Sequence, residues 1–275
     1  AGDTILIVNS EEQKPEVNTG GENSLPKTLP NQNEKHSSDL HVDVLVLGSG
    51  PGGYTAGFRA ADLGKKVLIV ERYDALGGVC LNVGCIPSKA LLHATKVISE
   101  AKEAKEMGVS FGDPKIDIEK LGRWTGDTVN KLTSGLEMLA KKRKVNILHG
   151  TGTFNSPHTI VVNTLSGSKL ISFDNAIIAA GSASNKIPDF PNGDPRMLDS
   201  TDALRISDIP KDLLIIGGGI IGLEMASVYH GLGSKVTIAE LTDGLIPEAD
   251  RDLVRPLHKI IEKRYESILL NTKVT

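Results

Sequence analysis

Two copies of one strand–turn–helix–strand pattern constrain this 275-residue chain more than any other feature. In each copy an apolar run ends in a turn of the form G-x-G-x-x-G, and the strand that follows the next helix ends in a glutamate. The first copy runs from Gly48 to Glu71 and the second from Gly217 to Glu240, which are spans of equal length. This internal repeat predicts an α/β fold with two Rossmann-like, three-layer βαβ domains, each binding a dinucleotide.

Each glycine turn has a definite chemical use in such a domain. The glycines permit a tight turn and let the backbone approach a pyrophosphate, and the helix N-terminus offers free N–H groups to that anion. The carboxylate at the end of the second strand accepts hydrogen bonds from ribose hydroxyls. The predicted binding residues are Gly48, Gly50, Gly53 and Glu71 in the first copy, and Gly217, Gly219, Gly222 and Glu240 in the second.

The only two cysteines of the chain, Cys80 and Cys85, lie in a glycine-rich loop at residues 77–89, directly after the first copy. A disulfide that closes so small a ring stabilises the fold by only roughly 2 kcal/mol in the loop-entropy account. Such a bond is better suited to opening and closing than to holding a fold together. Two buried structural cysteines are the alternative for an isolated C-x4-C, and the neighbouring nucleotide turn favours the redox pair.

The residues after Cys85 predict a helix that begins beside the sulfur. Pro87 is typical of a first helical turn, and the positive end of a helix dipole favours a thiolate. Lys89 lies four residues beyond Cys85, near the same helix face, and adds positive charge. Cys80, Cys85 and Lys89 are therefore the predicted catalytic residues.

Each glutamate and the residues that follow it bear on which dinucleotide its site binds. Glu240 repels a 2′-phosphate, and Leu241 and Thr242 offer no cation to receive one, so the second site predicts NAD. Arg72 follows Glu71, which leaves the first site open on this criterion. Because the cysteine loop leaves directly from Glu71 and a disulfide exchanges electrons readily with a flavin, we expect FAD there.

Composition excludes several other classes of protein. The formal net charge is −3, which gives no electrostatic case for binding nucleic acid or an anionic membrane. No apolar run approaches the ~18 residues of a membrane span. Two cysteines in a chain of this length indicate a reducing compartment, and we expect a cytoplasmic protein. The seven histidines show no metal-ligand spacing, so no metal site is predicted.

Composition shifts along the chain predict its domain organisation. Residues 1–8 contain a short strand-like run that we interpret as the end of an upstream domain, and residues 9–40 are polar and predict a disordered linker. An FAD domain is expected at 41–190, with a small antiparallel β insertion, and an incomplete NAD domain at 191–275. We expect a C-terminal interface domain to lie outside this chain.

The loop at residues 77–89, both glycine turns and the Ala-Ala-Gly-Ser run at 179–182 together resemble the flavoprotein disulfide reductases. Within that family the segment GGVCLNVGCIPSKALL at residues 77–92 is most similar to the dihydrolipoamide dehydrogenases. Residues 1–40 are similar to the end of a fused lipoyl domain with its linker. The resemblance implies that dihydrolipoamide reduces the Cys80–Cys85 disulfide by attack at Cys80, and that Cys85 contacts FAD, which reduces NAD. It adds to the predicted cofactor contacts Arg72, Gly78, Lys89, Gly152, Ala180, Gly181, Ser182, Glu224 and Val274.

The resemblance also implies partners and a missing part. Glu224 is expected to pair with Lys89, and the substrate is expected on a lipoyl domain of a 2-oxoacid (pyruvate) dehydrogenase complex. Family members are homodimers whose acid–base group comes from the interface domain, so we expect this chain alone to be inactive. Two alternatives stay open: another disulfide reductase of mercuric or glutathione type, and a truncated nucleotide-binding module without catalysis.

Overall fold

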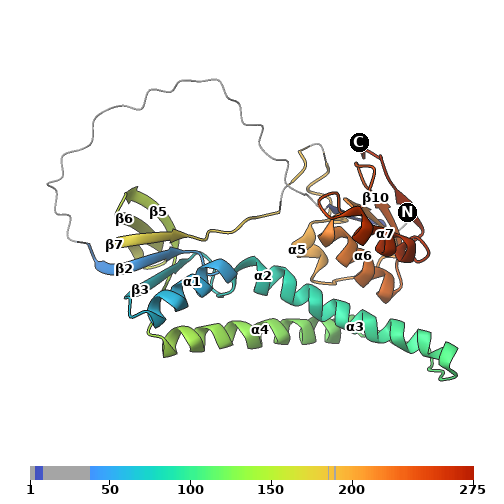
Figure 1. Cartoon of the computed structure of the whole chain (residues 1–275), viewed down its shortest axis with the longest axis horizontal. Coiled ribbons are helices and arrows are strands. Elements are labelled where there is room, and N and C mark those ends of the chain that lie inside the picture. Colours follow the sequence, from blue (N-terminus) through green and yellow to red (C-terminus); the bar gives the residue numbers. More distant parts are fainter. Residues whose placement is uncertain (1–3, 9–37, 185, 189) are drawn as a thin grey trace.

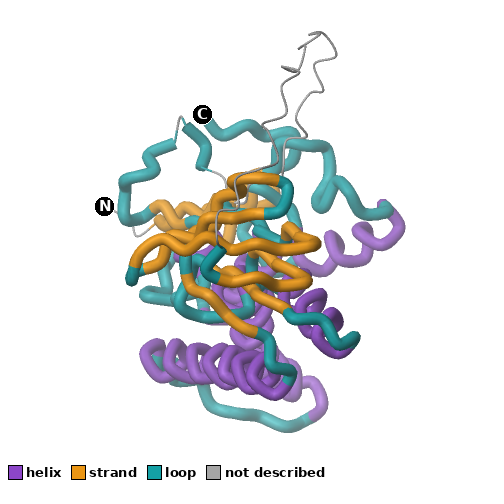
Figure 2. Tube along the Cα trace, turned by 90° about the vertical axis from the view of Figure 1, so that its left-hand side faces the viewer, coloured by secondary structure: helices purple, strands orange, loops and turns teal. Residues whose placement is uncertain are grey.

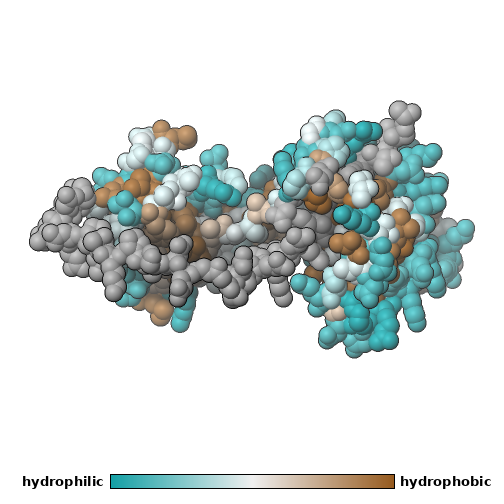
Figure 3. Space-filling model, turned by 90° about the horizontal axis from the view of Figure 1, so that it is seen from above, coloured by the Kyte–Doolittle hydropathy of each residue, from teal (hydrophilic) through white to brown (hydrophobic). Residues whose placement is uncertain are grey.

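The computed structural model describes residues 4–8 and 38–275, apart from 185 and 189. The predicted linker at 9–40 lies largely outside these residues; the first strand of the repeat begins at Leu40, one residue earlier than expected. Two sheets form two lobes with a narrower middle, as Figures 1 and 3 show. We call residues 38–182 the first unit, and residues 197–275 with strand β1 (Thr4–Val8) the second unit.

The first sheet has six strands in the order β4-β3-β2-β7-β6-β5. β2 pairs in parallel with β3 and β7, and β3 pairs in parallel with β4. β5, β6 and β7 form an antiparallel meander, which confirms the predicted β insertion. The strands are β2 (Leu40–Leu47), β3 (Val67–Glu71), β4 (Asn146–His149), β5 (Thr151–Ser156), β6 (Thr159–Thr164) and β7 (Gly167–Ile178).

Helices cover one face of the first sheet, and Figure 2 shows them below its strands. One apolar cluster fills the space between this face and the helices, and it includes Phe58, Ile69 and Leu136. A second cluster, with Ile160 and Phe173, lies on the other face against the antiparallel strands. The helices are α1 (Pro51–Asp62), α2 (Gly78–Val83), α3 (Cys85–Glu103), the 3-10 turn η1 (Ala104–Met107) and α4 (Ile118–Lys142).

The helical spacing of Val129, Leu132, Leu136 and Leu139 predicts a helix that begins at about Thr125. The observed helix α4 begins seven residues earlier, at Ile118. The side chain of Asp117 accepts a hydrogen bond from the amide of Lys120 at 2.9 Å, so an N-cap fixes the true start. Apolar spacing detects the buried part of a helix, whereas the cap lies in its exposed first turn.

The second sheet has the order β11-β10-β9-β1-β8, and all its pairs are parallel. β1 lies between β9 and β8, although the chain reaches it before any other strand. Its strand character agrees with the sequence, and its origin in an upstream domain stays a prediction. The remaining elements are β8 (Met197–Leu198), α5 (Ser200–Ala203), β9 (Asp212–Ile216), α6 (Ile220–Leu232), β10 (Lys235–Ala239), α7 (Arg251–Ile261) and β11 (Ser267–Leu269).

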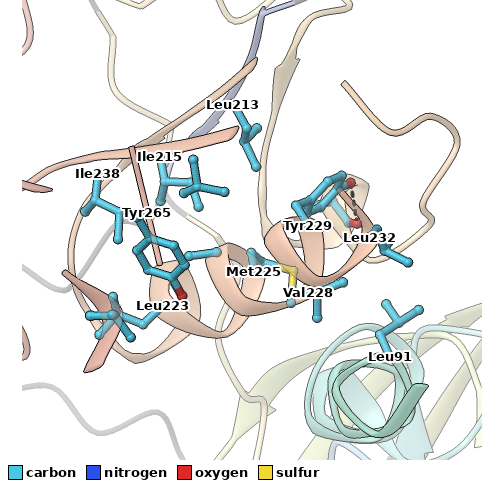
Figure 4. Close-up of a cluster of buried hydrophobic side chains, with 14 of the residues drawn as sticks. Leu91, Leu213, Ile215, Leu223, Met225, Val228, Tyr229, Leu232, Ile238 and Tyr265 are labelled. Carbon is cyan, nitrogen blue, oxygen red and sulfur yellow. Dashed lines mark hydrogen bonds between the residues drawn. The ribbon is translucent and has the colours of Figure 1, made fainter. Parts of the chain in front are cut away.

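α3 of the first unit packs against α6 of the second, and this contact positions the two halves of the site. Leu91 on α3 is fully buried and belongs to the second unit's core, where Figure 4 shows it facing α6. Gly231 permits the close approach, because a Cβ there would lie 2.6 Å from the Cβ of Thr95. α3, which begins at Cys85, and the second unit therefore share one core.

Tyr229, buried in that core, predicts a loss of stability in alkali. Its hydroxyl donates to the carbonyl of Ala203 at 2.9 Å, and burial, followed by the charge of Asp208, raises its pKa to about 12. Between the unfolded pKa near 10 and about 12, the unfolded state has lost a proton that the folded state keeps. The free energy of unfolding should therefore fall with rising pH, by up to about 1.4 kcal/mol per pH unit.

Denaturant titrations from pH 9 to 12 measure this slope. Tyr229→Phe should flatten it, leaving the part contributed by Tyr265, whose pKa burial also raises. An unchanged slope in Tyr229→Phe would contradict the assignment to Tyr229.

Candidate functional site

A cavity of about 680 Å³ lies at the carboxyl ends of the first unit's parallel strands and extends to α6. Ligands of open α/β sheets bind at this edge. Thirteen of the predicted site residues line it: Gly48, Gly50, Glu71, Arg72, Gly78, Cys80, Cys85, Lys89, Gly152, Ala180, Gly181, Ser182 and Glu224.

The first glycine turn has no room for side chains. Gly48 has φ of +100°, and a Cβ there would lie 2.2 Å from the carbonyl oxygen of Ala179. A Cβ on Gly53, a predicted residue that lies beside the cavity, would lie 1.9 Å from the carbonyl oxygen of Gly48. α1 begins at Pro51 with Gly50 as its N-cap and no capping side chain, so the amides of its first turn are free for an anion.

Glu71 is buried and held by the chain on both carboxylate oxygens. Its Oε2 accepts from the amide of Ser49 at 2.9 Å and from the Ser49 hydroxyl, and its Oε1 accepts from the amide of Tyr73 at 2.9 Å. The carboxylate thus connects the glycine turn to the strand end. The sequence did not indicate Ser49, because it occupies an x position of the G-x-G-x-x-G turn. Its burial and its two hydrogen bonds to Glu71 become evident only in the structure.

Glu240 repeats this arrangement in the second unit. Its Oε2 accepts from the amide of Gly218 at 2.6 Å, and its Oε1 accepts from the amide and hydroxyl of Thr242 at 2.7 and 2.8 Å. A Cβ on Gly222 would lie 2.2 Å from the carbonyl oxygen of Gly217, and Gly219 is the N-cap of α6. The second turn therefore has the same construction as the first, although the large cavity does not reach Gly217 or Glu240.

The segment at residues 77–89, predicted as a loop, instead forms helix α2 and the start of α3, and it packs directly on the first glycine turn. Gly78 has φ of +59°, and a Cβ there would lie 2.6 Å from the Cα of Gly50. Cys80 lies in α2 and is half-buried, whereas Cys85 is exposed and is the first residue of α3, as predicted. Both are free thiols, and both line the cavity.

The two thiols differ in their surroundings. Burial raises the pKa of the Cys80 thiol, its hydrogen bond and charge interaction with Cys85 raise it further, and the positive charge of Lys89 opposes these effects. The Cys80 thiol is therefore both less exposed and more difficult to ionise than an ordinary cysteine.

This difference predicts selective alkylation. In the cofactor-free chain at neutral pH, iodoacetamide should modify Cys85 several-fold faster than Cys80, because the thiolate is the reactive species and Cys85 is exposed. Peptide mass spectrometry after timed quenching measures both rates. Faster modification of Cys80 would contradict the structure.

An ion pair joins the two units across the cavity. The Lys89 ammonium contacts Oε1 of Glu224 on α6, as expected from the resemblance. Lys89 is largely exposed and Glu224 is mostly buried. The pair therefore places a positive charge four residues from Cys85, on the wall facing the second unit.

Of the remaining predicted residues, Arg72 lines the cavity and Val274 does not. Arg72 lies in the cavity wall with its guanidinium carbon 4.7 Å from the centroid of the Tyr73 ring. The sequence at Val274 and Thr275 predicts the start of a further strand, but residues 272–275 form none, and Val274 lies apart from the cavity. Ile220 and Ile221, from the segment 217–224 expected to contact NAD, line this cavity. The sequence did not indicate the second-unit lining residues Ser200, Leu204 and Met225, because α3–α6 packing brings them to the cavity.

A family model described as "Pyridine nucleotide-disulphide oxidoreductase" matches residues 42–275, which is most of the chain. The chain belongs to the pyridine nucleotide-disulphide oxidoreductase family. Membership agrees with the two nucleotide turns and the paired cysteines, and it confirms the predicted fold class.

Named relatives of this oxidoreductase family are similar over the same region. "Dihydrolipoyl dehydrogenase" of Vibrio cholerae is 55% identical over 239 residues, covering 87% of this chain and 50% of that protein. The protein of the same name from Haemophilus influenzae is 52% identical over 240 residues, with the same coverage. The chain thus spans about half the length of these curated relatives.

A solved structure shares the fold. The "HOCl-induced flavoprotein disulfide reductase RclA from Escherichia coli" has 28% identity and a TM-score of 0.71, and the match covers 84% of this chain and 49% of that one. Within the described residues, every helix is too short or too polar to cross a bilayer.

Proposed function

We propose that this chain is the dinucleotide-binding half of a dihydrolipoamide dehydrogenase that reduces NAD+ through FAD and the Cys80–Cys85 pair. The observation that carries the proposal is the position of the two free thiols in one cavity, which the first glycine turn and the Lys89–Glu224 pair also line. The similarity to dihydrolipoyl dehydrogenases over 87% of the chain supports it.

The cavity fits FAD by shape and by donor chemistry. Gly48 and Gly50 of the turn present bare backbone to the cavity, and Glu71 offers a carboxylate that could receive the ribose. Gly78, Gly152 and the turn at 180–182 would hold the remainder, with Arg72 at the rim. Bound FAD would supply two-electron transfer between the thiols and nicotinamide.

The second unit would bind NAD at the turn 217–222, with Glu240 receiving the ribose. A 2′-phosphate would meet the negative charge of Glu240, and residues 241–242 provide no compensating cation. We therefore propose NAD rather than NADP as the partner of this site, with Val274 as a further contact.

The cysteines would perform dithiol–disulfide exchange. One thiolate of dihydrolipoamide attacks the Cys80 sulfur of the oxidised pair, the S–S bond breaks, and Cys85 leaves as a thiolate. The second substrate thiolate then attacks the mixed disulfide, which releases cyclic lipoamide disulfide and leaves Cys80 reduced. Lys89 and the N-terminus of α3 stabilise the negative charge on Cys85.

The substrate would arrive on a lipoyl domain of a 2-oxoacid dehydrogenase complex, with the protein acting as a cytoplasmic homodimer. The resemblance implies an acid–base group that belongs to the half of the relatives that this chain does not cover. Turnover should therefore require the longer polypeptide, whereas dinucleotide binding should not.

Comparing turnover of a full-length form on dihydrolipoamide, glutathione disulfide and Hg(II) tests the proposal. Dihydrolipoamide should be oxidised with NAD+ at a rate far above the rates with the other substrates. Failure on lipoamide with activity on another substrate would assign the chain to that reductase, and failure on all three would favour the non-catalytic nucleotide-binding module.

A further inference from the structure

Three metal-ligating side chains converge on the first sheet, near the amino end of β2 and away from the cavity at its carboxyl end. A nitrogen of His41 and one carboxylate oxygen each of Asp43 and Asp174 lie within 4.8 Å of one another. Their spacing along the sequence does not reveal this, because Asp174 lies on β7.

Strand register brings the two aspartates together. β2 and β7 pair with Val42 beside Phe173 and Val44 beside Asn175, so Asp43 and Asp174 occupy the intervening positions. The amides of Asp43 and Val44 both donate to the carbonyl of Lys66, at 3.0 and 3.2 Å. Local irregularities of this kind re-aim a side chain, and here the chain at Asp43 departs from a regular ladder.

His41 is already oriented as a ligand. Its Nδ1 lies 2.9 Å from the Ser172 hydroxyl, which also contacts the hydroxyl of Ser38 at 2.8 Å. Its Nε2 lies 3.5 Å from Oδ1 of Asp174. A metal-binding histidine commonly has its second nitrogen fixed in this way, so that the free nitrogen faces the ion.

The cluster carries uncompensated negative charge. Like charges side by side on neighbouring strands repel. Among the ion pairs of the described residues, Asp174 pairs with His41 alone, and Asp43 has no lysine, arginine or histidine partner. Asp43 Oδ2 instead accepts from the backbone amide of Lys66 at 2.7 Å. A divalent cation would remove the repulsion.

We propose that His41, Asp43 and Asp174 form a binding site for a divalent transition-metal ion of the Zn²⁺ class, with water completing the coordination. Imidazole and carboxylate are both zinc ligands, with bonds of about 2.0–2.2 Å. Ligand atoms in a tetrahedral site then lie roughly 3.4 Å apart. The His41–Asp174 separation already matches this, and a small rotation of exposed side chains closes the rest.

The ion would link the start of β2 to β7. β2 begins at Leu40, so the site lies near the start of this strand. Strands hold ligands more rigidly than loops do, which favours a specific site over diffuse surface binding. This structural role is independent of the proposed dehydrogenase function.

Zinc titration of the whole chain tests the site, in a Cys80→Ser/Cys85→Ser background because the dithiol itself binds zinc. Competition with a chromophoric zinc indicator should show one equivalent bound. His41→Ala and Asp174→Asn should each weaken it at least ~10-fold, and His258→Ala, on α7 of the second unit, should not.

Asp43→Asn supplies a second readout. This substitution should lower the affinity for zinc at least ~10-fold. It should also raise the melting temperature of the zinc-free chain, because it removes the repulsion between the two carboxylates. Equal zinc affinity in the parent, His41→Ala and Asp174→Asn proteins would overturn the site, as would the absence of a bound equivalent in the folded parent protein.

Discussion

Gly53→Ala is expected to abolish FAD binding and to destabilise the first unit by at least about 3 kcal/mol. The new Cβ would lie 1.9 Å from the carbonyl oxygen of Gly48, which is a backbone atom that no side-chain rotation can move away. Relieving this overlap requires the glycine turn and α1 to separate, and that movement removes the surface on which a pyrophosphate would lie.

Gly126→Ala is the matched control for this substitution. Gly126 lies inside α4, and a Cβ there meets no atom within 4 Å. The same change should therefore stabilise the chain by about 0.5–1 kcal/mol and leave FAD affinity unchanged. Denaturant unfolding and flavin fluorescence titration measure stability and FAD affinity. A Gly53→Ala protein with normal FAD affinity would contradict the assignment of the turn at residues 48–53 as the pyrophosphate-binding surface.

Glu71→Gln and Glu240→Gln are expected to impair the two nucleotide sites separately. Each carboxylate accepts a backbone amide on both oxygens, so either orientation of a glutamine amide places an NH2 group against an N–H donor. The unsatisfied donor costs about 1–3 kcal/mol, and nucleotide affinity should fall roughly 10- to 100-fold.

The two variants control for each other. Glu71→Gln should lower the affinity for FAD with little effect on the affinity for NADH, and Glu240→Gln should do the reverse. Fluorescence titration of each ligand measures both affinities. If either variant weakened both ligands equally, the two units would not hold separate sites.

The sequence predicted the construction of the two βαβ units because their pattern is local. A glycine turn, the helix after it and the acid ending the next strand lie within one short segment, so spacing alone identifies Gly48, Glu71 and Glu240. Cys85 at the start of α3 follows for the same reason, since Pro87 marks the first helical turn.

Features that depend on contacts between distant segments could not be predicted from residue patterns. Register between β2 and β7 brings Asp174 beside Asp43, and nothing near either residue indicates the other. Likewise, the α3–α6 contact places Met225 in the cavity. The Lys89–Glu224 pair was expected from family resemblance, because no local pattern connects the two residues.

The proposed exchange requires that Cys85 face FAD and that Cys80 receive the substrate. The most direct measurement is the visible spectrum of the FAD-loaded chain after addition of a dithiol. A long-wavelength thiolate–flavin band should appear in the wild-type protein, persist or grow in Cys80→Ser, and be absent from Cys85→Ser. A band that survives in Cys85→Ser and disappears in Cys80→Ser would reverse the two roles, and a wild-type protein that binds no flavin would contradict the account.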